Sequence, residues 1–453
     1  MKKFLLGSTA LVAGGLLAAP AMAADPIKIG VGGYYQFYSM AGQIESVYPV
    51  IGSATPFGST QYKGIQFYQE GEIHFIGSSK LDNGTTVGVH VELEGWNQAA
   101  GRYIDEAFLF AFGDWGRIEF GSRDQASYRM YYGATSALLG WGAFQHNSSF
   151  GWTNLVAAAN NKAFARVTYS TIGGGFQDAN RINYFTPRFM GLQIGVGYAP
   201  KMNIGPVGNA GLNGVGAGTA GVCGFNDATT SSACPTNDYS YQDIFDVGVN
   251  YLNKFGDVTV AAYGAFMYAT FNPGFQFTQG IGSNTLTGAN MASWKQWVVG
   301  LQFGFAGFTV GGSYSWDNNG LGANYYTGMG NETRSFAVSV MYETGPWQLS
   351  ALWMNAINDN GNGSASVCTI ANGTNAVALC APGGTNAAFG QNTATGALSF
   401  GSEQANKFEI GVNYALGPGI KLVGGALMYN LSGPSNAVAG QSWGILLGMD
   451  LRF

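Results

Sequence analysis

The fold is decided by the end of the chain, Ser442-Trp443-Gly444-Ile445-Leu446-Leu447-Gly448-Met449-Asp450-Leu451-Arg452-Phe453. Every second residue from Trp443 onward is apolar, and the residues between are small or charged apart from Leu446. Side chains of a β-strand alternate between its two faces, so the stretch predicts a strand with one apolar and one polar face. As a free edge in water it would promote aggregation. We therefore expect its edge to close onto another strand and its apolar face to meet lipid.

The N-terminus has the features of a secretory signal peptide. Two lysines precede an apolar run over residues 4–17, and Pro20-Ala21-Met22-Ala23 has the small residues of a cleavage site. The run is short and interrupted by glycine, which argues against a membrane anchor. No later stretch of about 20 apolar residues could form a spanning helix. We expect residues 1–23 to be removed on export and residues 24–453 to form one domain.

The composition favours a membrane-embedded sheet over a soluble domain. Charged residues make up 10% of the chain, against about 25% in an ordinary soluble protein. The chain also contains 71 glycines and 14% aromatic residues. Its formal net charge of −5 becomes −7 once the two lysines of the leader are lost. Acidic charge spread along a chain offers no binding surface for nucleic acid, so we expect no such partner.

Alternating stretches of roughly ten residues, about 16 in number, follow one another to the C-terminus, the length that a tilted membrane strand needs. The connections between them alternate between long and short. The short ones are rich in Gly, Pro and Asn, which is typical of β-hairpin turns. The pattern does not indicate which face of the strand at 420–429 points inward. The predicted turns are Asp82-Asn83-Gly84, 113–116, 186–191, 253–257, Gly307, Gly345-Pro346 and 417–419.

The other connections include long polar segments. A compact soluble domain seldom contains several structureless loops of such length, whereas a membrane barrel carries them on its outer side. Aromatic residues recur where the apolar rows end, as they do at membrane interfaces. We therefore predict an all-β fold, a transmembrane antiparallel β-barrel of about 16 strands. The long segments are 40–62, 124–180, 200–242, 270–294, 317–333 and 355–406.

Titratable residues gather on one face of the hairpin that turns at Asp82-Asn83-Gly84. Histidines and carboxylates together could bind a divalent metal or perform acid–base chemistry. A water-facing lumen wall requires polar residues at such positions in any case, and we adopt this interpretation, with no metal and no cofactor expected. The predicted pore-lining residues of this hairpin are Glu70, Glu72, His74, His90, Glu92 and Glu94.

A second charged group lies around the start of segment 124–180. The apolar row Phe108, Phe110 and Phe112 sets the parity of the preceding strand and places Asp105 on the opposite, lumen face. The returning strand and the start of the long segment continue the charged set. The further predicted pore-lining residues are Arg117, Glu119, Arg123, Asp124 and Arg129.

The four cysteines form two local pairs, Cys223 with Cys234 and Cys368 with Cys380, each in a segment rich in Gly, Asn and Thr. Histidine is absent nearby, and the spacings are too wide for Cys-x-x-Cys metal sites. We expect two disulfides that pin exposed loops in an oxidising compartment. Their connectivity does not follow from the sequence.

Several of these features resemble Gram-negative general porins, particularly those of alphaproteobacteria. The most specific are the hairpin Phe112-Gly113-Asp114-Trp115-Gly116-Arg117-Ile118-Glu119-Phe120-Gly121-Ser122-Arg123-Asp124 and the terminal Phe453. The resemblance implies a 16-stranded homotrimer in the outer membrane, surrounded by lipid and lipopolysaccharide and narrowed by a third loop that folds inward. It also implies that the barrel assembly machinery reads Phe453. Leu451 stands where the family often has Tyr, a mild departure.

The expected function is passive diffusion of small hydrophilic solutes and ions, because a barrel of about 16 strands keeps an aqueous channel. In the resembling family, an acidic inward loop faces a basic wall. Here segment 124–180 has only Asp124 and Asp178 as acids, so the acidic hairpin is the expected source of a weak cation preference.

Two alternatives remain at this level. A substrate-selective channel for one sugar or amino acid would use loop aromatics as a sliding surface. A surface adhesin or structural barrel would have a closed lumen. Catalysis is not expected, since nothing marks His146 beside Ser148 and Ser149 as a hydrolase site. The loop aromatics are Tyr128, Tyr131, Tyr132, Trp141 and Phe144.

Overall fold

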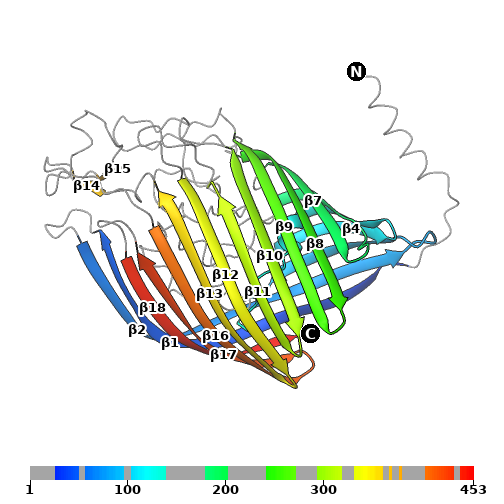
Figure 1. Ribbon diagram of the computed structural model, residues 1–453. Coiled ribbons are helices and arrows are strands. Elements are labelled where there is room, and N and C mark those ends of the chain that lie inside the picture. The colour runs from blue at the N-terminus through cyan, green and yellow to red at the C-terminus, as the bar shows by residue number, and fades with distance from the viewer. Residues whose placement is uncertain are drawn as a thin grey trace.

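The computed structural model describes residues 26–49, 57–95, 104–138, 179–201, 241–271, 293–318, 331–360, 367–369, 377–379, 403–432 and 439–453. Within these ranges sixteen antiparallel strands form one closed barrel, and β14 (Val367–Thr369) pairs with β15 (Val377–Leu379) in a separate sheet. None of the helical structure in this part of the chain is long and apolar enough to cross a membrane. The barrel strands, drawn in Figure 1, are β1 (Lys28–Pro49), β2 (Phe57–Lys80), β3 (Thr86–Glu94), β4 (Ile104–Gly113), β5 (Gly116–Arg123), β6 (Ala179–Phe185), β7 (Leu192–Lys201), β8 (Tyr241–Phe255), β9 (Val258–Phe271), β10 (Trp294–Phe305), β11 (Phe308–Asp317), β12 (Asn331–Thr344), β13 (Trp347–Asn360), β16 (Glu403–Gly417), β17 (Ile420–Ser432) and β18 (Ala439–Arg452).

The barrel closes by pairing its first strand with its last. β18 runs antiparallel to β1, with Tyr34 opposite Arg452 at one end of the ladder. Just beyond β18, Phe453 and Gly33 exchange backbone hydrogen bonds, 2.9 Å from the Gly33 amide and 3.1 Å to the Gly33 carbonyl. Each terminal strand is thereby hydrogen-bonded on both sides, β1 also to β2 and β18 also to β17. The predicted closure is confirmed.

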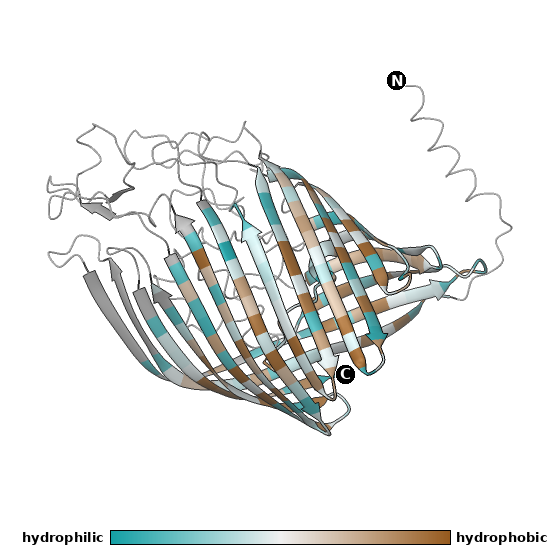
Figure 2. Ribbon diagram, viewed as in Figure 1, coloured by the Kyte–Doolittle hydropathy of each residue, from teal (hydrophilic) through white to brown (hydrophobic). Residues whose placement is uncertain are grey.

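The terminal strand has the two faces that its sequence predicts. Ile445 and Leu447 are 59% and 66% exposed on the outside of the barrel, and Phe453 is exposed as well. The alternate residues Leu446 and Asp450 are buried. Apolar and polar bands alternate in the same way along the other strands (Figure 2). An apolar outer surface of this kind suits contact with lipid.

All seven predicted turns connect neighbouring strands, and they lie at the same end of the barrel as the C-terminus (Figure 1). Gly84 follows β2 and Gly419 follows β16, with φ angles of +84° and +71°. Glycine adopts these left-handed angles without the steric penalty of a side chain. The turns were therefore recognisable from their residue types alone.

Two of the predicted loops are shorter than expected. Most of segment 40–62 is strand, because β1 continues to Pro49 and β2 begins at Phe57. Segment 355–406 is likewise shortened by the ends of β13 and β16. A ladder can continue beyond the apolar rows through backbone hydrogen bonds alone, without one buried face. Hydrophobic alternation therefore does not mark these extensions.

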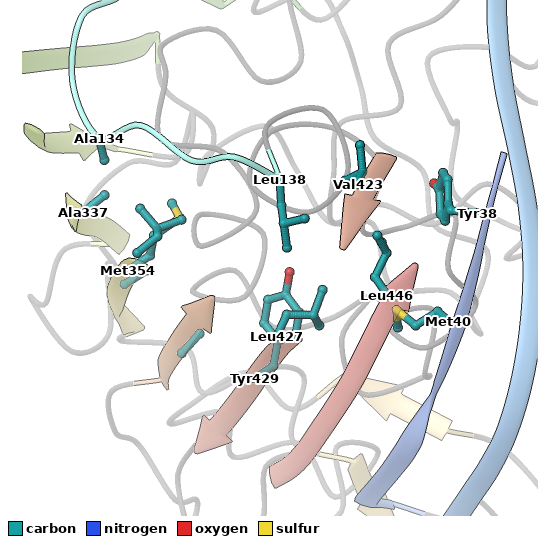
Figure 3. Close-up of a cluster of buried hydrophobic side chains, with 13 residues drawn as sticks. Tyr38, Met40, Ala134, Leu138, Ala337, Met354, Val423, Leu427, Tyr429 and Leu446 are labelled. Atoms are coloured by element: carbon teal, nitrogen blue, oxygen red, sulfur yellow. The ribbon is translucent and has the colours of Figure 1, made fainter. Parts of the chain in front are cut away.

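The inner face of β17, which the pattern of residues left open, is apolar. Val423, Leu427 and Tyr429 are almost completely buried, whereas Leu422 is 39% exposed on the outside. The three inner residues belong to a buried cluster with side chains of β1, β12, β13, β16 and β18 and with Leu138 (Figure 3). The inner face of β17 therefore packs against apolar side chains and is shielded from water.

One expectation about the strand faces is wrong. Phe108 and Phe110, expected on the outer face of β4, are 3% and 7% exposed, while Leu109 between them is 59% exposed. The two phenylalanines contact charged side chains of the inner wall: the Arg117 guanidinium lies 4.7 Å from the ring centre of Phe110. The apolar row of this strand therefore points inward.

The error lies in assigning this apolar row to lipid, because its rings pack against guanidinium groups of the inner wall. A separate feature of the strand, a β-bulge, places Asp105. The pairing of β3 with β4 shifts register, with Val91 opposite Ala107 but Leu93 opposite Ile104. Two residues of β4 then face a single residue of β3, and side-chain parity reverses beyond the bulge. Asp105 is one of these two residues. It reaches the inner wall because of the bulge and not because of the alternation assumed for the strand.

Candidate functional site

The segment that follows β5, residues 124–138, lies along the inner wall of the barrel, and we call it the inward segment. It contains the short helix α2 (Ala126–Arg129). At its start, Glu106 Oε1 accepts a hydrogen bond from the Asp124 amide at 2.8 Å, and Asn183 Nδ2 donates to the Asp124 carbonyl at 2.8 Å. This is the placement expected of a third loop that folds inward. The remainder of that loop, up to β6, lies outside the described residues.

From α2 onward, the inward segment passes along β8 and β9. The Ser127 amide donates to Asp246 Oδ1 at 2.7 Å, and its carbonyl accepts from the Tyr263 hydroxyl at 2.7 Å. The Met130 carbonyl accepts from Asn250 Nδ2 at 3.0 Å. Buried backbone groups require such partners, and here side chains of the wall supply them.

The second half of the segment continues in the same manner toward β16. Its main-chain amides and carbonyls again bond to polar side chains that project from the wall, so the attachment depends on the wall's residues more than on the segment's own side chains. These bonds join Gln302 Nε2 to the Gly133 carbonyl (2.8 Å), the Thr135 amide to Ser339 Oγ (2.6 Å), the Ala137 amide to Ser350 Oγ (2.8 Å) and Asn413 Nδ2 to the Ala137 carbonyl (2.7 Å).

Glycines on the wall allow the backbone of the inward segment to come close. A Cβ on Gly300 would collide with the carbonyl oxygen of Tyr132, and a Cβ on Gly311 would collide with that of Gly133. At Gly264, on the neighbouring β9, nothing lies within 4 Å of the same position. The glycines at the points of contact are therefore required by packing, since any side chain there would displace the segment.

The described part of the segment ends in an apolar anchor. Leu138 is completely buried and lies close to Val423, Leu427 and Leu446 (Figure 3). Next to it, the Ser136 hydroxyl donates a hydrogen bond to the Glu409 carboxylate. Burial of one leucine stabilises a docked segment by about 1.5–3 kcal/mol, so Leu138 is a principal attachment point.

Charged side chains concentrate where the inward segment leaves β5. Arg123 forms an ion pair with Glu106, and its Nη1 lies 3.4 Å from Glu92 Oε1. The same guanidinium lies 4.6 Å from the ring centre of Phe108. Burial raises the pKa of the Asp124 carboxyl, and the neighbouring Arg123 opposes this shift. Arg123 therefore joins the hairpin of β2 and β3 to the start of the segment.

Glu119 holds two arginines on the same wall. Its side chain is completely buried; Oε1 accepts from Arg117 Nε at 2.5 Å, and Oε2 pairs with Arg129 of α2. A buried carboxylate is stable when its partners are charged and hydrogen-bonded. Glu119 thus fixes the orientation of one arginine from the wall and one from the inward segment.

The hairpin of β2 and β3 places its histidines beside a carboxylate. His74 lies opposite Glu92 in the ladder. His90 Nε2 is 3.3 Å from His74 Nδ1 and 3.3 Å from Glu92 Oε1, and the distance between His74 Nδ1 and Glu92 Oε1 is 3.9 Å. The other ring nitrogen of His74, Nε2, is 3.0 Å from Glu72 Oε2. We call His74, His90 and Glu92 the histidine cluster.

The two charged groups that the sequence suggested separately meet in the structure, through the contact of Arg123 with Glu92. Asp105 joins them, with carboxylate oxygens of Glu72, Glu92 and Asp105 within 4.8 Å of one another. Of the remaining hairpin acids, Glu94 lies opposite Glu72 in the ladder, and Glu70 accepts a long hydrogen bond (3.5 Å) from the Tyr34 hydroxyl.

Sequence reasoning missed several charged residues of the inner wall. Arg181 and Asp246 are buried with 3.4 Å between Nη1 and Oδ2, and Lys407 and Glu409 are buried with 2.8 Å between Nζ and Oε2. Asp246 and Glu409 each stand between two apolar residues of an alternating strand, so parity could have identified them. Glu106 could not be found in this way, because it shares the face of Phe108 and Phe110, which alternation assigned to lipid.

Comparison with known proteins identifies a family. A family model described as Gram-negative porin matches residues 7–434. Uncharacterised proteins of Rickettsia conorii and Rickettsia prowazekii are each 22% identical, over 77% and 79% of this chain and 85% and 86% of their own lengths. Similar solved structures include the trimer form of OmpT, an outer membrane protein of Vibrio cholerae (12% identity, 93% of this chain, 99% of that chain, TM-score 0.48), and an anion-selective porin from Comamonas acidovorans (13%, 94%, 100%, 0.46).

Proposed function

Because the chain belongs to the Gram-negative porin family, an assignment that rests on a match over residues 7–434, we propose that it forms a water-filled channel for passive diffusion of small hydrophilic solutes and ions. The fold and the family place it in the outer membrane as a multi-pass β-barrel. The observation that carries the proposal is the inward segment, which is bonded to the wall from β4 to β16. A barrel of this strand number is too wide for side chains to fill, and a segment attached to the wall narrows the lumen.

Planar-bilayer recording of the purified protein tests this proposal. We expect discrete conductance steps that scale with the conductivity of the bulk salt solution, as a water-filled pore requires. A protein that is folded and inserted but shows negligible single-channel conductance would support the adhesin or structural-barrel alternative instead.

We propose a weak preference for cations. On the wall formed by β2 to β5 and the start of the inward segment, carboxylates outnumber the three arginines Arg117, Arg123 and Arg129. Rings and clusters of acidic side chains favour cations in a pore. Reversal potentials measured across a salt gradient should therefore have the sign of cation selectivity. Anion selectivity would contradict the assignment of this wall to the pore.

The second candidate is a substrate-selective channel in which loop aromatics form a sliding surface. One observation argues against this role for Tyr131. Tyr131 packs edge-on against Tyr263, with 5.4 Å between ring centres, and its hydroxyl donates to Ser313 Oγ at 3.0 Å. A tyrosine fixed to the wall in this way is a packing residue more than a sliding surface. Trp141 and Phe144 lie outside the described residues. Liposome-swelling assays separate the two candidates, since saturable flux of one sugar or amino acid would favour selectivity.

The remaining features of the proposal concern processing and assembly. We expect cleavage of residues 1–23, a homotrimer in contact with lipopolysaccharide, and recognition of Phe453 by the barrel assembly machinery. We also retain the two disulfides. Cys368 belongs to β14 and lies opposite Ala378, two residues before Cys380, which supports a local link. Cys223, Cys234 and Cys380 lie outside the described residues, as does the His146 region, for which no catalytic role is proposed.

A further inference from the structure

The three candidate ligand atoms of the histidine cluster lie close together, and two of their three separations match those around a tetrahedral metal ion. The separations between His90 Nε2, His74 Nδ1 and Glu92 Oε1 are 3.3, 3.3 and 3.9 Å. A tetrahedral zinc ion holds nitrogen and oxygen ligands at about 2.0–2.1 Å, which puts neighbouring ligands about 3.3–3.4 Å apart. We propose that His74, His90 and Glu92 bind one divalent transition-metal ion of the zinc type on the inner wall.

A carboxylate behind the cluster gives independent support. Glu72 Oε2 lies 3.0 Å from His74 Nε2, the ring nitrogen that points away from the proposed ion. Histidines that bind metals usually donate their second N–H to a carboxylate, which fixes the tautomer and leaves the other nitrogen free to bind. A proton on Nε2 would leave the lone pair of Nδ1 facing His90 and Glu92.

The barrel holds the ligands in place before any ion binds. His74 and Glu92 are direct partners in the β2–β3 ladder, and His90 is two residues from Glu92 on the same face of β3. The ring of His90 packs against Phe108, with 5.1 Å between ring centres. The two histidine side chains are 24% and 14% exposed, so an ion can reach them and water can occupy the fourth ligand position.

The neighbouring charges and the ligand types determine which ion the proposed site would bind. Arg123 lies 3.4 Å from Glu92 Oε1 but is also paired with Glu106, so it can keep a partner when Glu92 binds a metal. Two imidazoles with one carboxylate suit zinc, copper or nickel, whereas magnesium and calcium prefer oxygen ligands alone. The bound ion would add positive charge beside Arg123, and under the proposed channel function it would reduce the conductance for cations.

Zinc titration of the mature protein in detergent, without a polyhistidine tag and after chelator treatment, tests the proposal. Isothermal titration calorimetry should show one Zn²⁺ per chain and no comparable binding of Mg²⁺. His74→Gln and His90→Gln should each weaken zinc binding at least tenfold, and Glu72→Gln should weaken it about tenfold. His146→Gln is the matched control, because it removes the remaining histidine of the chain and should leave the affinity unchanged.

X-ray absorption at the zinc edge of the wild-type protein supplies a test that does not depend on the variants folding. Two imidazole ligands and no sulfur at about 2.3 Å are expected, and sulfur ligation would assign the zinc to cysteines and overturn the proposal. An affinity unchanged in the folded double variant of His74 and His90 would also overturn it, as would failure of the wild type to bind zinc. These binding measurements are separate from conductance, so failure of the channel proposal would leave their result intact.

Discussion

Leu138 offers the sharpest test of how the inward segment is held. The side chain is completely buried among residues of β17 and β18, and Leu138→Ala would remove most of that contact and leave a cavity. Such a change costs about 2–5 kcal/mol. Since the lost contact is between the segment and the wall, we expect the cost to fall on docking of the segment and not on the sixteen-stranded ladder.

Hydrogen exchange at two backbone amides measures this loss. The amides of Thr135 and Ala137 donate to Ser339 Oγ at 2.6 Å and to Ser350 Oγ at 2.8 Å, so they exchange when the segment leaves the wall. A penalty of about 2–5 kcal/mol corresponds to exchange that is about thirtyfold to five-thousandfold faster. Mass spectrometry of peptides covering residues 124–138, from protein in detergent micelles, gives the rates.

Leu109→Ala is the matched control, because it makes the same chemical change at a residue that is 59% exposed on the outer face. It should leave the exchange of residues 124–138 unchanged. The reasoning is refuted if Leu138→Ala exchanges at the wild-type rate in these peptides. It is equally refuted if the strands of the barrel lose protection together with the segment.

Three other predictions follow from the same contacts. Arg123→Ala removes a positive charge that pairs with Glu106 and should shift the reversal potential toward stronger cation selectivity in bilayer recordings; a shift toward anions would contradict its place on the pore wall. Deleting Phe453 removes two backbone hydrogen bonds to Gly33. The deletion should reduce the amount of heat-modifiable barrel in the outer membrane far more than it alters the conductance of the channels that form. Normal assembly would count against the role of the seam between β1 and β18. Gly300→Val should displace the inward segment and change the single-channel conductance, while Gly264→Val, in open space, should not; equal conductance of the two variants would show that close packing at Gly300 does not position the segment.

The sequence predicted those parts of the fold in which one strand face meets lipid and the other does not. The terminal strand, the seven turns and the closing seam all follow from alternation and from turn chemistry that depends on glycine. The extension of β1 to Pro49 and the early start of β2 at Phe57 did not follow, because ladders outside the apolar zone are held by backbone hydrogen bonds that leave no pattern in the residues.

The sequence predicted residues of the candidate site but not the contacts between them. Simple parity placed Arg117, Glu119 and Arg123 on the inner wall, and the structure puts their side chains into ion pairs there. The inward direction of Phe108 was not predictable, since its ring packs against Arg123 and His90 of neighbouring strands, contacts that the alternation of one strand does not reveal. The apolar inner face of β17 was hidden for another reason: it packs against a segment distant in sequence, so that strand lacks the polar face that defines the others.

The way in which the inward segment is attached separates the position of the segment from the width and charge of the passage beside it. Its position is set by main-chain bonds to serine, asparagine and glutamine side chains of the wall and by the space that wall glycines leave. Side chains of the segment that do not face the wall are not used for this purpose. Substitutions at those positions can alter the width and charge of the passage while the scaffold that supports it stays the same, so such a channel can acquire a new permeability without first acquiring a new fold.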